Sequence, residues 1–221
     1  GSMSGAGITP ATDTRTRVLL SFAMDNHGAA FAYWLRDRLM KTYGWYAPNA
    51  VYMDCVASRE LTTEHARTMD QHTGPKVAGH VYVAPDEREK FTSQGYKPIG
   101  ALNPLWNEMY VAAMQQAQAM VMMVTPEYMA SEWCLKEWGQ FEEENIRRAG
   151  SGQALLKGVA ISFIGTLDRP TQTGKPINVT NVTVLPAAKL HGLGGLLWHK
   201  EDYGIAESDY QKLCGLLGPL T

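Results

Sequence analysis

The sequence predicts one doubly wound α/β domain over residues 17–221, with a parallel sheet of about five short strands. Two observations predict it. Of the 221 residues, 45% are hydrophobic and 19% are charged, which is typical of a globular protein with a substantial core. Short apolar runs alternate along the chain with stretches whose apolar residues recur at helical spacing. This alternation implies parallel strands joined by right-handed crossovers, with helices covering both faces of the sheet.

The first half of the chain supplies two strands and the helix between them. Residues 17–24, RVLLSFAM, form a short apolar run that predicts a strand. Residues 28–44 carry apolar side chains at helical spacing and end on Gly44, a helix stop signal. Residues 50–54, AVYMD, predict the second strand. Residues 1–16 are mostly small and polar, and we place them outside the domain as a tag remnant and a disordered terminus.

The second half continues the alternation with three helices and two strands. Pro104 is of a type favoured in the first turn of a helix, and Ser131 is a candidate N-cap. The elements predicted here are a helix at 104–118, a strand at 119–124, a helix at 131–148, a strand at 155–165 and a helix within 205–217.

Two connections are much longer than the few residues usual between such elements. Residues 55–103 form an extended, elaborated loop inserted after the second strand, and residues 80–100 within it could form a hairpin. Residues 166–197 are rich in glycine, proline and threonine, with one candidate short strand at VTVLP, residues 182–186.

Composition also limits the partners. No apolar stretch approaches the roughly 18 residues of a membrane span. The net charge is -2 and the basic residues form no runs, so we expect neither nucleic-acid nor membrane binding. The three cysteines lack paired spacing, which indicates a reducing, cytoplasmic location. The six histidines show no zinc-binding spacing, so we expect no metal site.

Ligands of doubly wound sheets bind beyond the carboxyl ends of the strands. The residues predicted there are Phe22 to Asp25, Asp54, Thr125 and Gly165. We therefore expect a site built from these positions and from the loops that they feed.

Glu137 stands out in the segment SEWCLKEW, residues 131–138. At helical spacing it shares a face with large, mainly apolar side chains, namely those of Trp133, Cys134, Trp138 and Phe141. An acidic residue in an apolar stripe breaks the usual pattern unless it has a function. The alternative is that Glu137 lies at the margin of the stripe and reaches water or a backbone donor.

These segments together resemble the Toll/interleukin-1 receptor (TIR) family. TPEYMASEWCLKEW, residues 125–138, is similar to the family pattern SxxYxxSxWCxxE, and RVLLSFAMD, VYMD, VAISFIG and LLWHKEDY resemble other family segments. The resemblance implies a flavodoxin-like sheet and runs from about residue 17 to the C-terminus. Residues 55–103 do not fit it.

The resemblance also implies site residues. NAD+-cleaving TIR domains carry a glutamate four residues after the tryptophan of this helix, which corresponds here to Glu137 after Trp133. Glu137 is thus the expected catalytic residue. Substrate contacts are expected from Ser21, Phe22, Asp25, Asp54 and Trp133, although Phe22 and Trp133 could equally be core aromatics.

One departure from the family concerns the pyrophosphate of NAD+. Several members carry basic residues just after the first strand, where this chain has Ala23 and Met24. Arg59, Lys97 or a basic residue of a neighbouring subunit could take their place.

The first functional hypothesis is an NAD+ nucleosidase that releases nicotinamide and forms ADP-ribose or a cyclic ADP-ribose isomer. NAD+ is its substrate, and no cofactor is expected. The resemblance to stand-alone bacterial, Thoeris-like immune TIR proteins implies self-association with other TIR domains and a downstream effector that senses the product. The alternative is a non-catalytic TIR interaction module that assembles signalling complexes.

Overall fold

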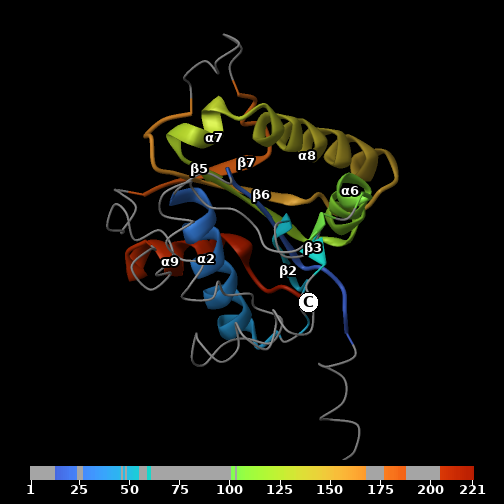
Figure 1. Ribbon diagram of the computed structural model, residues 1–221, viewed down its shortest axis with the longest axis horizontal. Coiled ribbons are helices and arrows are strands. Elements are labelled where there is room, and N and C mark those ends of the chain that lie inside the picture. The colour runs from blue at the N-terminus through green and yellow to red at the C-terminus, as the bar shows by residue number, and fades with distance from the viewer. Residues whose placement is uncertain are drawn as a thin grey trace, which may run out of the picture.

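A five-stranded, all-parallel sheet forms the centre of the computed structural model, in the order β2-β1-β5-β6-β7 (Figure 1). The structure describes residues 13–23, 27–45, 47, 49–54, 59–60, 101–102, 104–167, 177–187 and 205–221. The strands of this sheet are β1 (Val18–Ser21), β2 (Val51–Tyr52), β5 (Ala119–Val124), β6 (Lys157–Ser162) and β7 (Val182–Pro186). This is the flavodoxin-like order, in which the direction of winding reverses between β1 and β5.

Helices cover both faces of the sheet, as predicted. Figure 1 shows α2 (His27–Tyr43) and α9 (Glu207–Leu217) on one side. On the other side lie α6 (Trp106–Gln116), α7 (Pro126–Ala130) and α8 (Glu132–Gly150). The buried apolar residues accordingly divide into two clusters, one on each face of the sheet.

Strand β5 explains why the predicted strands are apolar without alternation. All six of its residues are fully buried. Ala119, Val121 and Met123 belong to the cluster under α2 and α9, whereas Met120 and Met122 belong to the cluster under α6, α7 and α8. Successive side chains of a strand point to opposite faces, so a strand covered on both faces is apolar throughout.

The helix signals at Gly44 and Ser131 are confirmed, whereas Pro104 lies ahead of α6 and not in its first turn. One division of a helix was not predicted. Gly44 follows α2 with a φ of 69°, a conformation that glycine adopts without strain. Ser131 caps α8, since its hydroxyl accepts a hydrogen bond from the Cys134 amide at 3.3 Å. The segment before Ser131 forms the separate short helix α7, which Thr125 caps by accepting from the Tyr128 amide at 3.2 Å.

The edges of the predicted elements differ in detail. Strand β2 has only two residues, and the helix expected from Pro104 begins at Trp106. The short strand predicted at 182–186 is present as β7. Packed chain begins before residue 17, because Thr16 is buried at 4% exposure.

The insertion after β2 has a paired base. β3 (Arg59–Glu60) and β4 (Ala101–Leu102) form an antiparallel two-stranded sheet, so the two ends of the insertion lie side by side. The hairpin considered at 80–100 and the family-like segment at 196–203 fall outside the described residues.

Arg148 fixes α8 against α6. Its buried guanidinium donates hydrogen bonds to the carbonyl oxygens of Met114 and Ala117, at 2.9 and 2.8 Å, and to a carboxylate oxygen of Glu144 at 2.8 Å. The last carbonyls of a helix lack partners within that helix, so a cation there satisfies them and opposes the helix dipole. These bonds fix the C-terminal half of α8 against α6. Glu137 lies in the N-terminal half of the same helix.

Candidate functional site

The candidate site lies at the carboxyl edge of the sheet, where β1 and β5 diverge. Ser21 is the last residue of β1, and Thr125 directly follows β5. Leu19 pairs with Tyr52, and Ser21 and Asp54 each follow two residues later, so both occupy matching positions at this edge. A reversal of winding leaves a crevice at such an edge that open α/β sheets use for ligands.

Glu137 meets the end of β1 through one short hydrogen bond. The Ser21 hydroxyl donates to Oε2 of Glu137 at 2.6 Å, although the two residues are far apart in the sequence. Ser21 is buried at 1% exposure, whereas Glu137 retains partial exposure. The carboxyl group is thus anchored to the end of β1, while the residue as a whole keeps part of its surface exposed.

Tyrosines surround this pair. The Tyr128 hydroxyl lies 2.8 Å from the Ser21 hydroxyl and also 3.4 Å from the Cys134 carbonyl oxygen. Tyr110 and Tyr128 are buried at 2% and 0% exposure. The ring of Tyr52 packs edge-on against that of Tyr110, with their centroids 6.0 Å apart. Buried tyrosines thus lie around the Ser21–Glu137 pair, and the Tyr128 hydroxyl bonds to its serine.

Burial is the largest influence on the ionisation of Glu137, and it raises the pKa of this carboxyl group to about 8. The negative charge of Asp54 acts in the same direction, whereas hydrogen bonds from Ser21 and Tyr110 lower the pKa. Glu137 consequently exchanges its proton near neutral pH. Shifted ionisable groups of this kind are concentrated at functional sites.

Of the predicted substrate-contacting residues, Ser21 and Asp54 lie at the same edge as Glu137. Phe22 is 7% exposed and packs in the cluster under α2 and α9, as expected of a core aromatic. Asp25 lies outside the described residues, as do Lys97 and the side chain of Arg59.

The predicted apolar stripe of α8 needs a correction at Trp133. Cys134, Trp138 and Phe141 are buried as predicted, but Trp133 is 54% exposed. Its ring packs edge-on against Trp106 of α6, with centroids 5.0 Å apart, and the Lys136 ammonium lies 4.8 Å from its centroid. The buried face of α8 is rotated relative to the predicted stripe. Trp133 therefore lies at the surface, and Glu137 lies at the boundary between buried and exposed residues.

Sequence reasoning did not select Tyr128, Tyr110 or Tyr52 for the site. Tyr128 occupies the tyrosine position of the TPEYMAS segment, which is the one available signal. Tyr110 and Tyr52 read as ordinary residues of an amphipathic helix and a short strand. Only the tertiary structure brings Tyr110 near the carboxylate and packs Tyr52 against Tyr110.

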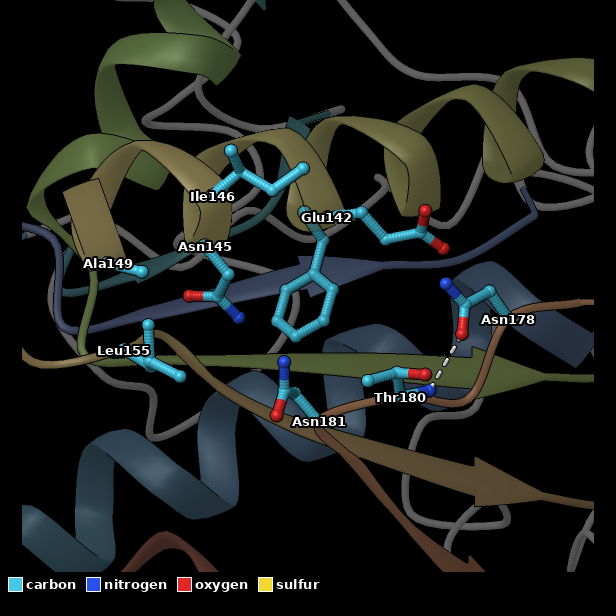
Figure 2. Close-up of a pocket in the computed structure, with 9 residues that line it drawn as sticks. Glu142, Asn145, Ile146, Ala149, Leu155, Asn178, Thr180 and Asn181 are labelled. Atoms are coloured by element: carbon cyan, nitrogen blue, oxygen red, sulfur yellow. Dashed lines mark hydrogen bonds between the residues drawn. The ribbon is translucent and has the colours of Figure 1, made fainter.

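A second surface feature lies farther along α8. Figure 2 shows a groove with Glu142, Asn145, Ile146 and Ala149 of α8 on one side. Residues Asn178, Thr180 and Asn181, which lead into β7, lie on the other. Neither Glu137 nor Ser21 lines the groove, so it is separate from the candidate site.

Within the described part of the chain, no group of three or more histidine, cysteine or acidic residues could hold a metal ion. No helix in that part is long and apolar enough to cross a membrane. Comparisons with protein-family models, with curated proteins and with solved structures find no match for this chain. The site residues are therefore the basis for the function proposed next.

Proposed function

We propose that this protein is a cytoplasmic NAD+ nucleosidase of the TIR type, which cleaves the bond between nicotinamide and ribose. The observation that carries the proposal is the Glu137 carboxyl group, held at the carboxyl edge of a flavodoxin-like sheet by Ser21, whose hydroxyl also bonds to buried Tyr128. One carboxylate held in this way is sufficient for the cleavage of NAD+, whereas ordinary glycosides require two.

The reaction needs one carboxylate because nicotinamide is a good leaving group. The nicotinamide nitrogen of NAD+ is cationic, so the electron pair of the breaking C–N bond neutralises it and no general acid is required. Ordinary glycosidases need a second carboxyl group to protonate the leaving oxygen. Positive charge then develops on the ribose, and ionised Glu137 stabilises it more strongly in an apolar surround than in water.

The second half of the reaction determines the product. Attack of water on the ribosyl cation, with loss of one proton, gives ADP-ribose. Attack by a nucleophile of the adenine or a ribose of the same molecule gives a cyclic isomer instead. Either product could serve as a signal for a separate effector protein.

The experiment is to incubate the protein with NAD+ and to measure nicotinamide release by chromatography. We expect release from the wild type and a loss of at least about 100-fold in Glu137→Gln, because transition-state charge stabilisation of this kind contributes several kcal/mol. Glu143→Gln is the matched control, since Glu143 is exposed on the same helix. Absence of nicotinamide from the wild type, or full activity in Glu137→Gln, would contradict the proposal.

One observation favours the alternative, a TIR interaction module. The residues Ile146 and Leu155, which line the groove of Figure 2, are 74% and 43% exposed. Adjoining exposed apolar side chains mark interaction surfaces more often than isolated ones do. We propose a second copy of this chain as the partner, which is compatible with either function.

A further inference from the structure

A continuous chain of hydrogen-bonding groups runs from Glu137 into the protein. Oε2 of Glu137 lies 2.6 Å from the Ser21 hydroxyl, which lies 2.8 Å from the Tyr128 hydroxyl. The Tyr128 hydroxyl lies 3.4 Å from the carbonyl oxygen of Cys134. This chain joins β1, α7 and the first turn of α8, and it starts on the carboxyl group assigned to catalysis.

The number of hydrogens in this chain restricts its direction. Each hydroxyl carries one hydrogen, a carboxylate can only accept, and a backbone carbonyl can only accept. When Glu137 is ionised, Ser21 donates to it, and Ser21 in turn accepts from Tyr128. When Oε2 of Glu137 carries a proton, it can donate to Ser21, Ser21 then donates to Tyr128, and Tyr128 donates to the Cys134 carbonyl. The same heavy-atom positions therefore serve both states.

We propose that Tyr128 is a positioning residue for Glu137, acting through Ser21, and that this chain reverses its direction when the carboxyl group gains or loses its proton. The Cys134 carbonyl is the fixed acceptor that makes the reversed direction possible. The catalytic consequence rests on the function proposed above, whereas the hydrogen-bond chain itself does not.

Tyr128 strengthens the ionised state in this arrangement. A serine hydroxyl that accepts from a phenol is polarised, and it becomes a better donor to the carboxylate. The other groups that face Glu137 from the described elements are Tyr110 from α6 and Asp54 after β2. Both remain in place when the Tyr128 hydroxyl is removed, so that substitution isolates the contribution of Tyr128.

The test is direct titration of Glu137 by carbon-detected NMR of its side-chain carboxyl group in the full chain, with Glu137→Gln identifying the signal. We expect Tyr128→Phe to raise the titration midpoint by about half a pH unit to one unit, a threefold to tenfold change, because the charge-assisted bond is weakened. Ser21→Ala is expected to raise it further. In the Ser21→Ala background, Tyr128→Phe should then change nothing.

Two further variants make the test specific. Tyr43→Phe is the control, since the Tyr43 hydroxyl donates to the Gly218 carbonyl at 3.2 Å and takes no part in the chain. Replacing Tyr128 by 3-fluorotyrosine preserves the ring and makes the hydroxyl a stronger donor, so the midpoint should fall. This variant also serves if Tyr128→Phe does not fold.

The outcomes separate this inference from the proposed function. An unchanged midpoint in Tyr128→Phe, or an equal shift with and without Ser21, overturns the role of Tyr128 whether or not NAD+ is cleaved. Wild-type protein that releases no nicotinamide overturns the nucleosidase, while the NMR titration still tests the chain. If both hold, the activity lost in Tyr128→Phe at neutral pH returns as the pH is raised above the new midpoint, because the ionised carboxylate is then restored.

Discussion

At the scale of the residue, Glu137 combines two properties that conflict in a purely structural position. It is an acidic side chain, and burial raises its pKa to about 8. It also accepts a hydrogen bond of 2.6 Å from Ser21, which favours the ionised form. Burial thus disfavours the ionised form of Glu137, while the Ser21 hydroxyl stabilises that form when it is present. In the proposed reaction that charge is balanced when the ribose becomes cationic.

The raised pKa of Glu137 makes the stability of the protein depend on pH. The folded-state pKa of about 8 exceeds the ordinary value of 4.5, so protonation of Glu137 favours the folded state. Its contribution to the free energy of unfolding is fully present below pH 4.5 and is lost as the pH rises through 8. We expect the wild type to lose on the order of 4 kcal/mol relative to Glu137→Gln between about pH 5 and about pH 9. Urea unfolding of both proteins across this range measures the difference. A difference that stays constant with pH would show that Glu137 titrates normally.

At the scale of the element, the position of α8 over the sheet depends on its contact with β6. Gly158 of β6 lies where a side chain would collide with Phe141, since an added Cβ would stand 2.7 Å from its Cζ atom. It would also stand 3.1 Å from a methyl group of Val182. The missing side chain therefore lets the Phe141 ring lie against the sheet, and this contact helps to set the height of α8 above the strands.

Gly158→Ala should therefore destabilise the protein. Overpacking of a tight site costs about 1–3 kcal/mol, because Phe141 and its helix must shift to accept the methyl group. Gly139→Ala is the contrasting change in α8, where an added Cβ meets no atom within 4 Å. There we expect a gain of about 0.5–1 kcal/mol from helix propensity. Thermal unfolding of both variants is the measurement, and equal stabilities would refute the packing argument.

At the scale of the whole molecule, the strand order determines where the site forms. Because the winding reverses between β1 and β5, the site lies at the edge where open α/β sheets generally bind their ligands. Glu137 enters this edge from α8, Tyr128 from α7 and Tyr110 from α6. The groove between α8 and the segment before β7 is a different surface, for which we have proposed self-association.

Self-association through that groove gives a test at the same scale. Ile146→Asp places a charge on a side chain that is 74% exposed, so the fold should be preserved while an apolar contact between copies is lost. We expect a decrease in mean mass by light scattering at high protein concentration. Glu143→Gln is again the control. If Ile146→Asp assembles as the wild type does, the groove is not the contact between copies.

The sequence by itself determined the alternation of strands and helices, because burial on both faces demands continuous apolar strands and amphipathic helices. It also singled out Glu137 by its break in the pattern of α8 and Asp54 by its place at a strand end, whereas Ser21 was expected only from the family resemblance. The division of α7 from α8 was not predicted, since it depends on the extended conformation of Ser131.

Only the tertiary structure decided which groups meet the carboxylate. Ser21 and Glu137 are 116 positions apart, and Ser21 and Tyr128 are 107 positions apart. No local pattern encodes contacts across such separations, because they follow from the order of the strands and from the height and rotation of the helices above them. The same rotation left Trp133 at the surface. The sequence thus determined the fold class and the carboxylate, and the packing of the helices on the sheet decided the surroundings that give this carboxylate its chemistry.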